Sequence, residues 1–315
     1  MPIALLLSVM ALGCPSHGPN APGRMIDESA TTPGSEIVLS EVSFQSGGDV
    51  VPALLARPAG AGEFPAVVVI HANSLREPYI GETVGLLAKA GFVGIAVDVF
   101  HFLPRVGWEE FQNLPGDLIR SRLDTEFRED RLVRNVRSSI DYLHTLPFVR
   151  KGGVALLGFC GGGWNAFLVA AQSVDIESVV AFYAPVAEAN ATRRSPQSLA
   201  GFITVPVQYH RATEDPYIRE ADVERFTTTL RSHRSPVEVF IYPASHGFFA
   251  SNRAGVFDAR AAELAWSRTL PFLRAHTGHP VRQRPVAPPW QEHPMPGGAR
   301  DSSSSSEHWL LHRSR

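Results

Sequence analysis

The chain is poor in cysteine and nearly neutral, and each feature excludes a class of protein. Its 315 residues include only two cysteines, Cys14 and Cys160, so a disulfide framework and a thiolate-rich metal site are both excluded. The formal net charge is −2, which gives no reason to expect nucleic acid or an acidic membrane surface as a partner. Hydrophobic residues make up 44% of the chain, which is enough to fill the core of a globular domain.

The N-terminus carries an apolar run, Ile3–Leu12, that is too short to cross a bilayer as a helix. Its length suits the apolar core of a secretory signal. The ending Leu12-Gly13-Cys14 resembles the lipobox of bacterial lipoproteins, although no Lys or Arg precedes the run and Ala11 replaces the usual leucine. Two interpretations stay open, with export slightly favoured. Residues 1–14 are either a lipoprotein leader, with a lipid anchor through Cys14 in the bacterial cell envelope, or an untargeted start of a cytoplasmic protein.

Two further segments have the composition of unfolded chain. Residues 15–35 are rich in Pro, Gly, Ser and Thr, as in a flexible linker. Residues 278–315 are crowded with Pro, His and Arg and contain the serine run Ser302–Ser306, which is typical of a disordered tail. We therefore expect a single folded domain over residues 36–277.

Within this domain, short apolar runs alternate with amphipathic stretches, which predicts an α/β fold. The pattern predicts strands over residues 37–44, 50–57, 66–71, 92–98, 154–157, 179–183, 205–210 and 237–242, and helices over 79–90, 123–146, 161–172, 218–231 and 258–276. The first two strands form an antiparallel pair around Gly47-Gly48. The later alternation indicates a mostly parallel sheet with helices on both faces. In such sheets the ligand crevice lies beyond the carboxyl ends of the strands.

The strongest local signal is Gly158-Phe159-Cys160-Gly161-Gly162-Gly163, which follows an expected strand and opens an expected helix. It matches the nucleophile elbow of α/β-hydrolases, Gly-x-nucleophile-x-Gly, with cysteine as the nucleophile. Side chains at Gly158 and Gly162 would clash in so sharp a turn, and the helix N-terminus favours a thiolate. Three alternatives compete. A lone cysteine is usually a small buried hydrophobe, and the glycines resemble a phosphate loop or a Rossmann fingerprint, although both motifs are incomplete here.

The acid and the base are expected after later strands, in the chain order of α/β-hydrolases. Asp215 follows the strand that ends at His210, and His246 follows the strand that ends at Tyr242. Each has an ordinary alternative, since Asp before proline is common in turns and a histidine before glycine is common in loops. Together they predict a Cys160–His246–Asp215 triad, with Glu214 as the rival of Asp215.

Acyl transfer also requires hydrogen-bond donors for the oxyanion. The backbone N–H of Gly161 supplies one, and the loop after the strand over residues 66–71 supplies the other, from Asn73 or its neighbour Ala72. His71 also ends a strand, but it precedes the elbow, and we expect a structural role for it.

The sequence resembles the dienelactone hydrolase family over nearly all of residues 50–276. The resemblance rests on the cysteine elbow, on the Asp215 turn and on the stretch from His246-Gly247-Phe248 to Trp266. It implies an α/β-hydrolase fold and hydrolysis of small carboxylic esters or lactones, with no metal or organic cofactor. The reaction would pass through an acyl-thioester on Cys160.

The chain departs from the family pattern at two positions. Studied members carry a glutamate that contacts the resting cysteine, and the matching position is Ala72; they also carry an arginine four residues after the histidine, and that position is Ala250. Arg105 and Arg253 lie nearby in sequence as replacements for binding substrate. The other expected substrate contacts or rim residues are Tyr183, Phe248, Phe100, His101 and Trp108.

Two alternative functions stay open beside the hydrolase. The first is a non-catalytic lipoprotein that keeps the fold as a binding scaffold, and Ala72 slightly favours it. The second is a redox-responsive thiol protein, which lacks a resolving cysteine. The sequence leaves the natural substrate and the oligomeric state open.

Overall fold

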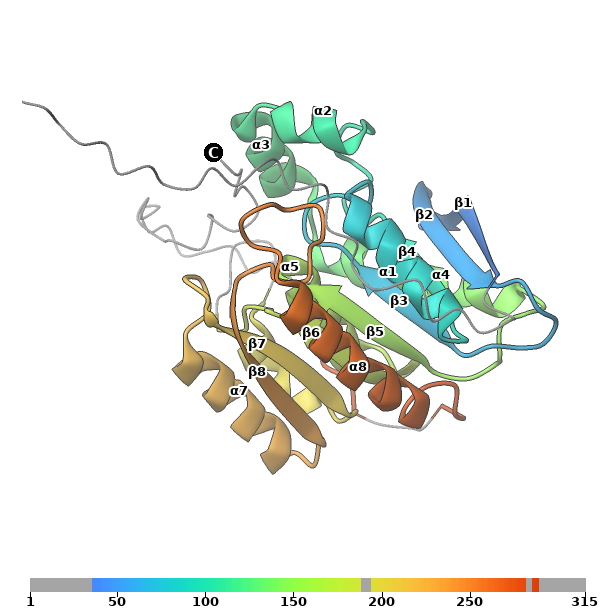
Figure 1. Cartoon of the computed structure of the whole chain (residues 1–315). Helices are drawn as coiled ribbons and strands as arrows, with labels where there is room; N and C mark the ends of the chain where they lie inside the picture. Colours follow the sequence, from blue (N-terminus) through green and yellow to red (C-terminus); the bar gives the residue numbers. More distant parts are fainter. Residues whose placement is uncertain (1–35, 188–193, 282–284, 289–315) are drawn as a thin grey trace, which may run out of the picture.

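The computed structural model describes residues 36–187, 194–281 and 285–288. One eight-stranded sheet runs through this part of the chain, with the strand order β1-β2-β4-β3-β5-β6-β7-β8. Helices cover both of its faces (Figure 1). The predicted α/β-hydrolase architecture is thereby confirmed.

The sheet begins with an antiparallel hairpin and is parallel beyond β4. β1 (Ile37–Ser46) pairs with β2 (Asp49–Pro58) around Gly47-Gly48, as predicted, and β2 pairs antiparallel with β4 (Val93–Val97). The remaining pairs are parallel and involve β3 (Ala66–Ile70), β5 (Val154–Phe159), β6 (Ile176–Phe182), β7 (Val207–Glu214) and β8 (Val237–Ser245). β3, β4 and β5 are apolar and buried along their whole length, because helices cover both faces there.

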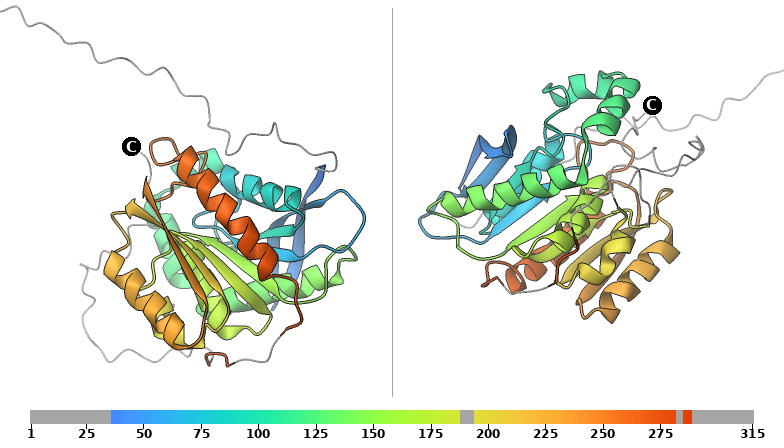
Figure 2. Two further views of the ribbon diagram at one scale, coloured as in Figure 1. Left: turned by 60° about the horizontal axis from the view of Figure 1, so that its bottom comes forward. Right: turned by 180° about the vertical axis from the view of Figure 1, so that it is seen from behind.

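The helices form two layers. α1 (Pro78–Lys89) and α8 (Ala259–Ala275) lie on one face of the sheet, in front in Figure 1. α4 (Glu129–Thr145), α5 (Gly161–Gln172) and α7 (Glu220–Ser232) lie on the other, as the view from behind in Figure 2 shows. The short α6 (Pro196–Leu199) contacts both α5 and α7. The apolar stripe of α4 is buried as its spacing predicted.

The prediction of one helix over residues 123–146 is wrong. α3 (Gly116–Glu126) ends and α4 begins separately, because Phe127 and Arg128 have extended backbone. Phe127 is buried against Phe100, with ring centroids 5.5 Å apart, so the chain turns inward there. α2 (Trp108–Asn113) and α3 bury almost none of their side chains and stand above the carboxyl ends of the strands (Figure 1).

The boundary expected at residue 277 is too early. Gly278 donates its N–H to Gly153, and Ala287 is buried and donates its N–H to the carbonyl of Ala171 at 2.7 Å. Part of the expected tail therefore packs on the domain. The expected leader with Cys14, and the linker over residues 15–35, lie outside the described residues. Within the described part, no helix combines the length and the apolar composition needed to cross a bilayer.

Candidate active site

Cys160 occupies the turn between β5 and α5, at the N-cap of α5. Its backbone has φ 51° and ψ −121°, a strained conformation for a residue with a side chain. The turn is as tight as the sequence predicted. A Cβ at Gly158 would lie 2.4 Å from the carbonyl oxygen of Gly162, and one at Gly162 would lie 2.0 Å from that of Ile70. The Cys160 N–H donates to Phe182 at 2.9 Å, which ties the turn to β6.

His246 and Asp215 meet Cys160 from the ends of two neighbouring strands. His246 directly follows β8, and Asp215 directly follows β7. The His246 Nδ1–H donates to Asp215 Oδ2 at 2.7 Å, and Nε2 lies 3.1 Å from Cys160 Sγ. The Asp215 side chain is 1% exposed, whereas its rival Glu214 is exposed at the end of β7. The geometry therefore joins Asp215 to His246.

The electrostatics of this group favour a charged imidazole. Burial alone would lower the pKa of His246, but the adjacent Cys160 sulfur and the Asp215 carboxylate outweigh it and raise this pKa to about 10. An imidazolium between a sulfur and a carboxylate is the arrangement that stabilises a cysteine thiolate.

The loop after β3 lies beside the elbow, where the oxyanion donors were expected. The tight approach of Gly162 to the carbonyls of Ile70 and His71 holds this loop against α5. Ala72 is buried and Asn73 is partly exposed. His71 is fully buried, with Nε2 3.5 Å from Asp98 Oδ1, which agrees with a structural role.

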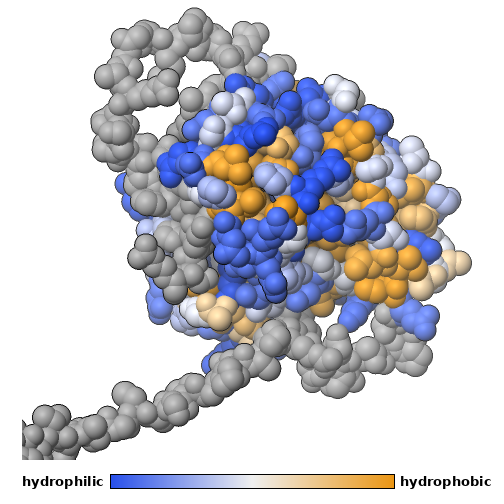
Figure 3. Space-filling model, turned by 90° about the horizontal axis from the view of Figure 1, so that it is seen from above, coloured by the Kyte–Doolittle hydropathy of each residue, from blue (hydrophilic) through white to orange (hydrophobic). Residues whose placement is uncertain are grey.

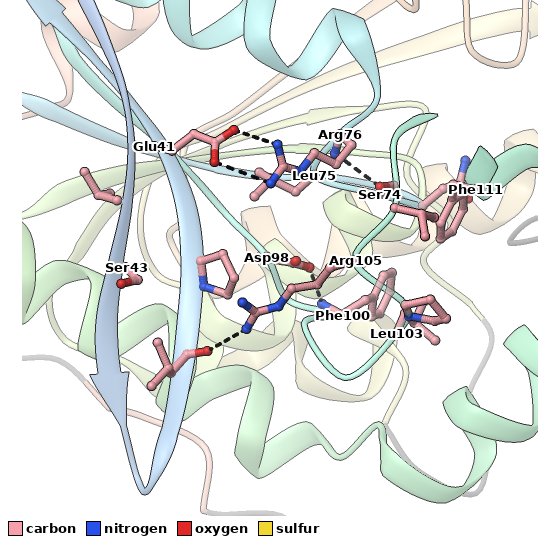
Figure 4. A pocket seen from close by; sticks show the side chains of 16 residues that line it. Glu41, Ser43, Ser74, Leu75, Arg76, Asp98, Phe100, Leu103, Arg105 and Phe111 are labelled. Atoms are coloured by element: carbon pink, nitrogen blue, oxygen red, sulfur yellow. Dashed lines mark hydrogen bonds and ion pairs between the residues drawn. The ribbon is translucent and has the colours of Figure 1, made fainter. Parts of the chain in front are cut away.

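A cavity of about 330 Å³ opens between this loop, the loop after β4, the β1–β2 hairpin and α2 (Figure 4). Its walls carry Glu41, Val42, Ser43, Val50, Pro52, Asn73, Ser74, Leu75, Arg76, Asp98, Phe100, Leu103, Pro104, Arg105, Val106 and Phe111. Asn73 thus belongs both to the cavity and to the candidate oxyanion loop, whereas neither Cys160 nor His246 lines the cavity. Figure 3 shows the molecule from above, where apolar side chains gather in several patches between hydrophilic ones.

The two arginines expected to bind substrate differ in their surroundings. Arg105 lines the cavity, and its guanidinium donates to the carbonyl of Val50, at 3.3 Å. Arg253 instead donates to both carboxylate oxygens of the fully buried Glu77, at 2.5 and 2.9 Å. Its guanidinium also lies 6.0 Å from the ring of Trp108.

Glu77 was missed by the sequence analysis, although the chain held a signal for it. Pro78 opens α1, and a proline at the first position of a helix places the preceding residue at its N-cap. Through its ion pair with Arg253, Glu77 joins the start of α1 to the loop after β8. This loop is fixed a second time by Ser251, which donates to Glu82 at 2.6 Å.

The aromatic residues expected at the pocket rim separate into two groups. Phe100 lines the cavity. Phe248 is fully buried against Tyr183 and Tyr242, so its expected place at the rim is wrong and it belongs to the core. His101 lies 3.6 Å from Asp49, Trp108 stacks on Phe111, and Tyr183 packs edge-on against His246, all outside the cavity walls.

Within the described residues, no group of three or more His, Cys, Asp or Glu side chains is arranged to hold a metal ion.

Comparisons with known proteins agree with this fold. The model of the dienelactone hydrolase family matches residues 51–277. A probable 2-oxo-3-(5-oxofuran-2-ylidene)propanoate lactonase from Bradyrhizobium sp. is 31% identical over 245 residues, covering 76% of this chain and 95% of that protein. Carboxymethylenebutenolidase 1 from Cupriavidus pinatubonensis is 30% identical over 238 residues, covering 74% of this chain and 94% of the relative.

Among solved structures, a candidate dienelactone hydrolase from Klebsiella pneumoniae subsp. pneumoniae superposes with a TM-score of 0.68. It is 23% identical and covers 76% of this chain and 99% of its own. At that identity the likeness shows the fold alone. The alternative of a non-catalytic lipoprotein scaffold gains no support from these relatives.

Proposed function

The chain belongs to the dienelactone hydrolase family, and from this premise we propose that it hydrolyses small carboxylic esters or lactones through Cys160. The single observation that carries the proposal is the hydrogen-bonded series Cys160 Sγ, His246 and Asp215, at 3.1 and 2.7 Å. Nucleophile, base and orienting acid within hydrogen-bond reach are the requirements of nucleophilic acyl transfer.

The proposed reaction has two halves. The Cys160 thiolate attacks the ester carbonyl carbon, and backbone N–H groups at Gly161 and Asn73 stabilise the oxyanion. The carbon–oxygen bond then breaks, and the His246 imidazolium gives its proton to the leaving oxygen. Water, deprotonated by His246, next attacks the acyl-thioester and releases the acid and the thiolate. Asp215 holds the imidazole in its tautomer throughout.

The cavity beside Asn73 supports a small polar substrate for the same site. A carbonyl oxygen held at Asn73 would place the rest of the molecule against the mixed wall of Phe100, Asp98 and Arg105. The Bradyrhizobium relative is named for an anionic lactone, and Arg105 is the cavity arginine that lacks a carboxylate partner among the described residues. We therefore include anionic esters and lactones in the proposed substrate class.

A Cys160→Ala comparison tests the proposal directly. With p-nitrophenyl acetate, kcat should fall by roughly three orders of magnitude or more, because residues that act as a unit fail together. Iodoacetamide should inactivate the unmodified protein at pH 6 to 7, faster than it modifies a free thiol, because the thiolate is the reactive form. His246→Ala should lower both rates, and Cys160→Ser should keep at most a trace of hydrolysis.

Two results would overturn this function. The first is hydrolysis by Cys160→Ala at the rate of the unmodified protein. The second is inactivity of the unmodified protein on every ester and lactone tried.

A further inference from the structure

Tyr183 is a buried residue for which packing alone gives no complete explanation. It directly follows β6, and its backbone has φ 38°, one of only three positive values found for non-glycine residues in the described part of the chain. Its side chain is 2% exposed, yet its hydroxyl has no hydrogen-bond partner there. Strain and an unpaired buried donor both disfavour folding, and such features are concentrated at functional sites.

The position of Tyr183 connects it to both Cys160 and His246. The preceding residue, Phe182, accepts the backbone N–H of Cys160, and the Tyr183 ring packs edge-on against the His246 imidazole with centroids 5.0 Å apart. Arg253, Cys160, Glu77 and Asp215 are the groups whose charges act on its phenol. Tyr183 therefore lies directly beside the base of the proposed reaction, with a buried hydroxyl that has no hydrogen-bond partner among the described residues.

We propose that the Tyr183 hydroxyl donates a hydrogen bond to the leaving oxygen of the bound ester or lactone. This inference rests on the proposed function. In the proposed reaction, backbone N–H groups donate to the carbonyl oxygen. The leaving ester oxygen is therefore the acceptor that still needs a donor beside His246. As the sulfur–carbon bond forms and the carbon–oxygen bond breaks, the proton on the leaving oxygen comes from His246. Tyr183 keeps its own proton, which agrees with the way burial raises the pKa of its phenol well above the ordinary value.

Tyr183→Phe separates this role from a structural one, because it keeps the ring and removes only the hydroxyl. Its kcat/KM should fall about tenfold for phenyl acetate and distinctly less for p-nitrophenyl acetate. The p-nitrophenolate leaving group is a weaker base, so its departure depends less on a hydrogen bond to the leaving oxygen. Its melting temperature should stay level or rise, since an unpaired buried polar group is lost. Its iodoacetamide rate should match that of the unmodified protein, because Cys160 and His246 are unchanged.

Tyr209→Phe is the matched control. Tyr209 is equally buried, but its hydroxyl donates to the carbonyl of Ala184. Its removal should therefore lower the melting temperature while kcat/KM stays within about twofold for both esters.

The proposal is overturned if Tyr183→Phe loses the same factor on both esters, or keeps kcat/KM within twofold on each. It is also overturned if the melting temperature falls as far as in Tyr209→Phe, or if alkylation slows, since the hydroxyl would then serve the fold or the thiolate. A failure of the proposed function is distinguishable, because the unmodified protein would itself hydrolyse neither ester.

Discussion

The carboxyl edge of the sheet has two parts that are built very differently. At the ends of β5, β7 and β8, hydrogen bonds of 2.7 and 3.1 Å join Cys160, His246 and Asp215. Cys160 is buried, and the side chains of His246 and Asp215 are only 11% and 1% exposed. At the ends of β3 and β4, the cavity is bordered by exposed charges. Its Arg76–Glu41 ion pair is 45% and 65% exposed.

The contrast shows where the structure is rigid and where it can vary. Buried, hydrogen-bonded groups hold one geometry because an unpaired charge or donor in the interior is costly. An exposed ion pair contributes roughly 0–1 kcal/mol and is easily replaced. We infer that the buried part sets the reaction and that the cavity selects the substrate.

The largest expected effect comes from breaking the buried part at its acid. Asp215→Asn should lower kcat on p-nitrophenyl acetate by roughly 10²–10⁴-fold, because the amide no longer fixes the tautomer of His246 or balances its charge. The matched control is Glu214→Gln, one residue earlier and exposed, which should stay within about twofold. Equal losses in the two variants, measured by steady-state kinetics, would contradict the assignment of Asp215 over its neighbour.

The two parts also differ in how far the sequence predicts them. The elbow, Asp215 and His246 follow from strand ends and local spacing, since parallel strands bring their carboxyl ends to one edge whatever the loops do. Arg253 shows the limit. Its pairing with Glu77 joins residues far apart in sequence, and only the packing of α1 beside the loop after β8 brings them together.

The helix break at Phe127 has the same origin. Residues 123–146 are locally suited to one helix, but the burial of Phe127 against Phe100 overrides that local preference. The expected rim position of Phe248 failed similarly, because proximity to His246 in sequence does not say to which side a ring turns.

A smaller effect is expected from the cavity. Arg105→Gln should raise KM severalfold for the anionic ester mono-p-nitrophenyl succinate and leave KM for neutral p-nitrophenyl butyrate unchanged, because its guanidinium has no carboxylate partner among the described residues. Arg76→Gln is the control, since Glu41 already neutralises this arginine in the same cavity wall. A similar rise for both esters would mean that Arg105 shapes the cavity without recognising charge.

The last expected effect concerns stability and separates two histidines, His210 inside β7 and His246 directly after β8. His246 has a pKa raised to about 10, so its stabilising charge is fully present below the unfolded value of about 6.5 and is lost as pH rises towards 10. His210, inside β7, has the opposite shift. Burial and, to a lesser degree, the nearby positive charge of Arg268 lower its pKa to about 3. The neutral ring forms a hydrogen bond of 2.8 Å with the Tyr242 hydroxyl.

Because the pKa of His210 is lowered on folding, this residue makes the folded chain less stable in acid. Below about pH 6.5 this histidine is protonated in the unfolded chain but stays neutral in the folded chain. Its contribution should therefore lower the free energy of unfolding by about 1.4 kcal/mol per pH unit until pH 3 is approached. His210→Gln keeps a hydrogen-bonding side chain but cannot titrate, so its unfolding free energy in urea should depend less on pH between 6.5 and 4.5. Because His210 is not part of the proposed triad of Cys160, His246 and Asp215, kcat/KM at pH 7 should change little. An equal acid dependence in both proteins would show that His210 is protonated in the folded chain as readily as in the unfolded one.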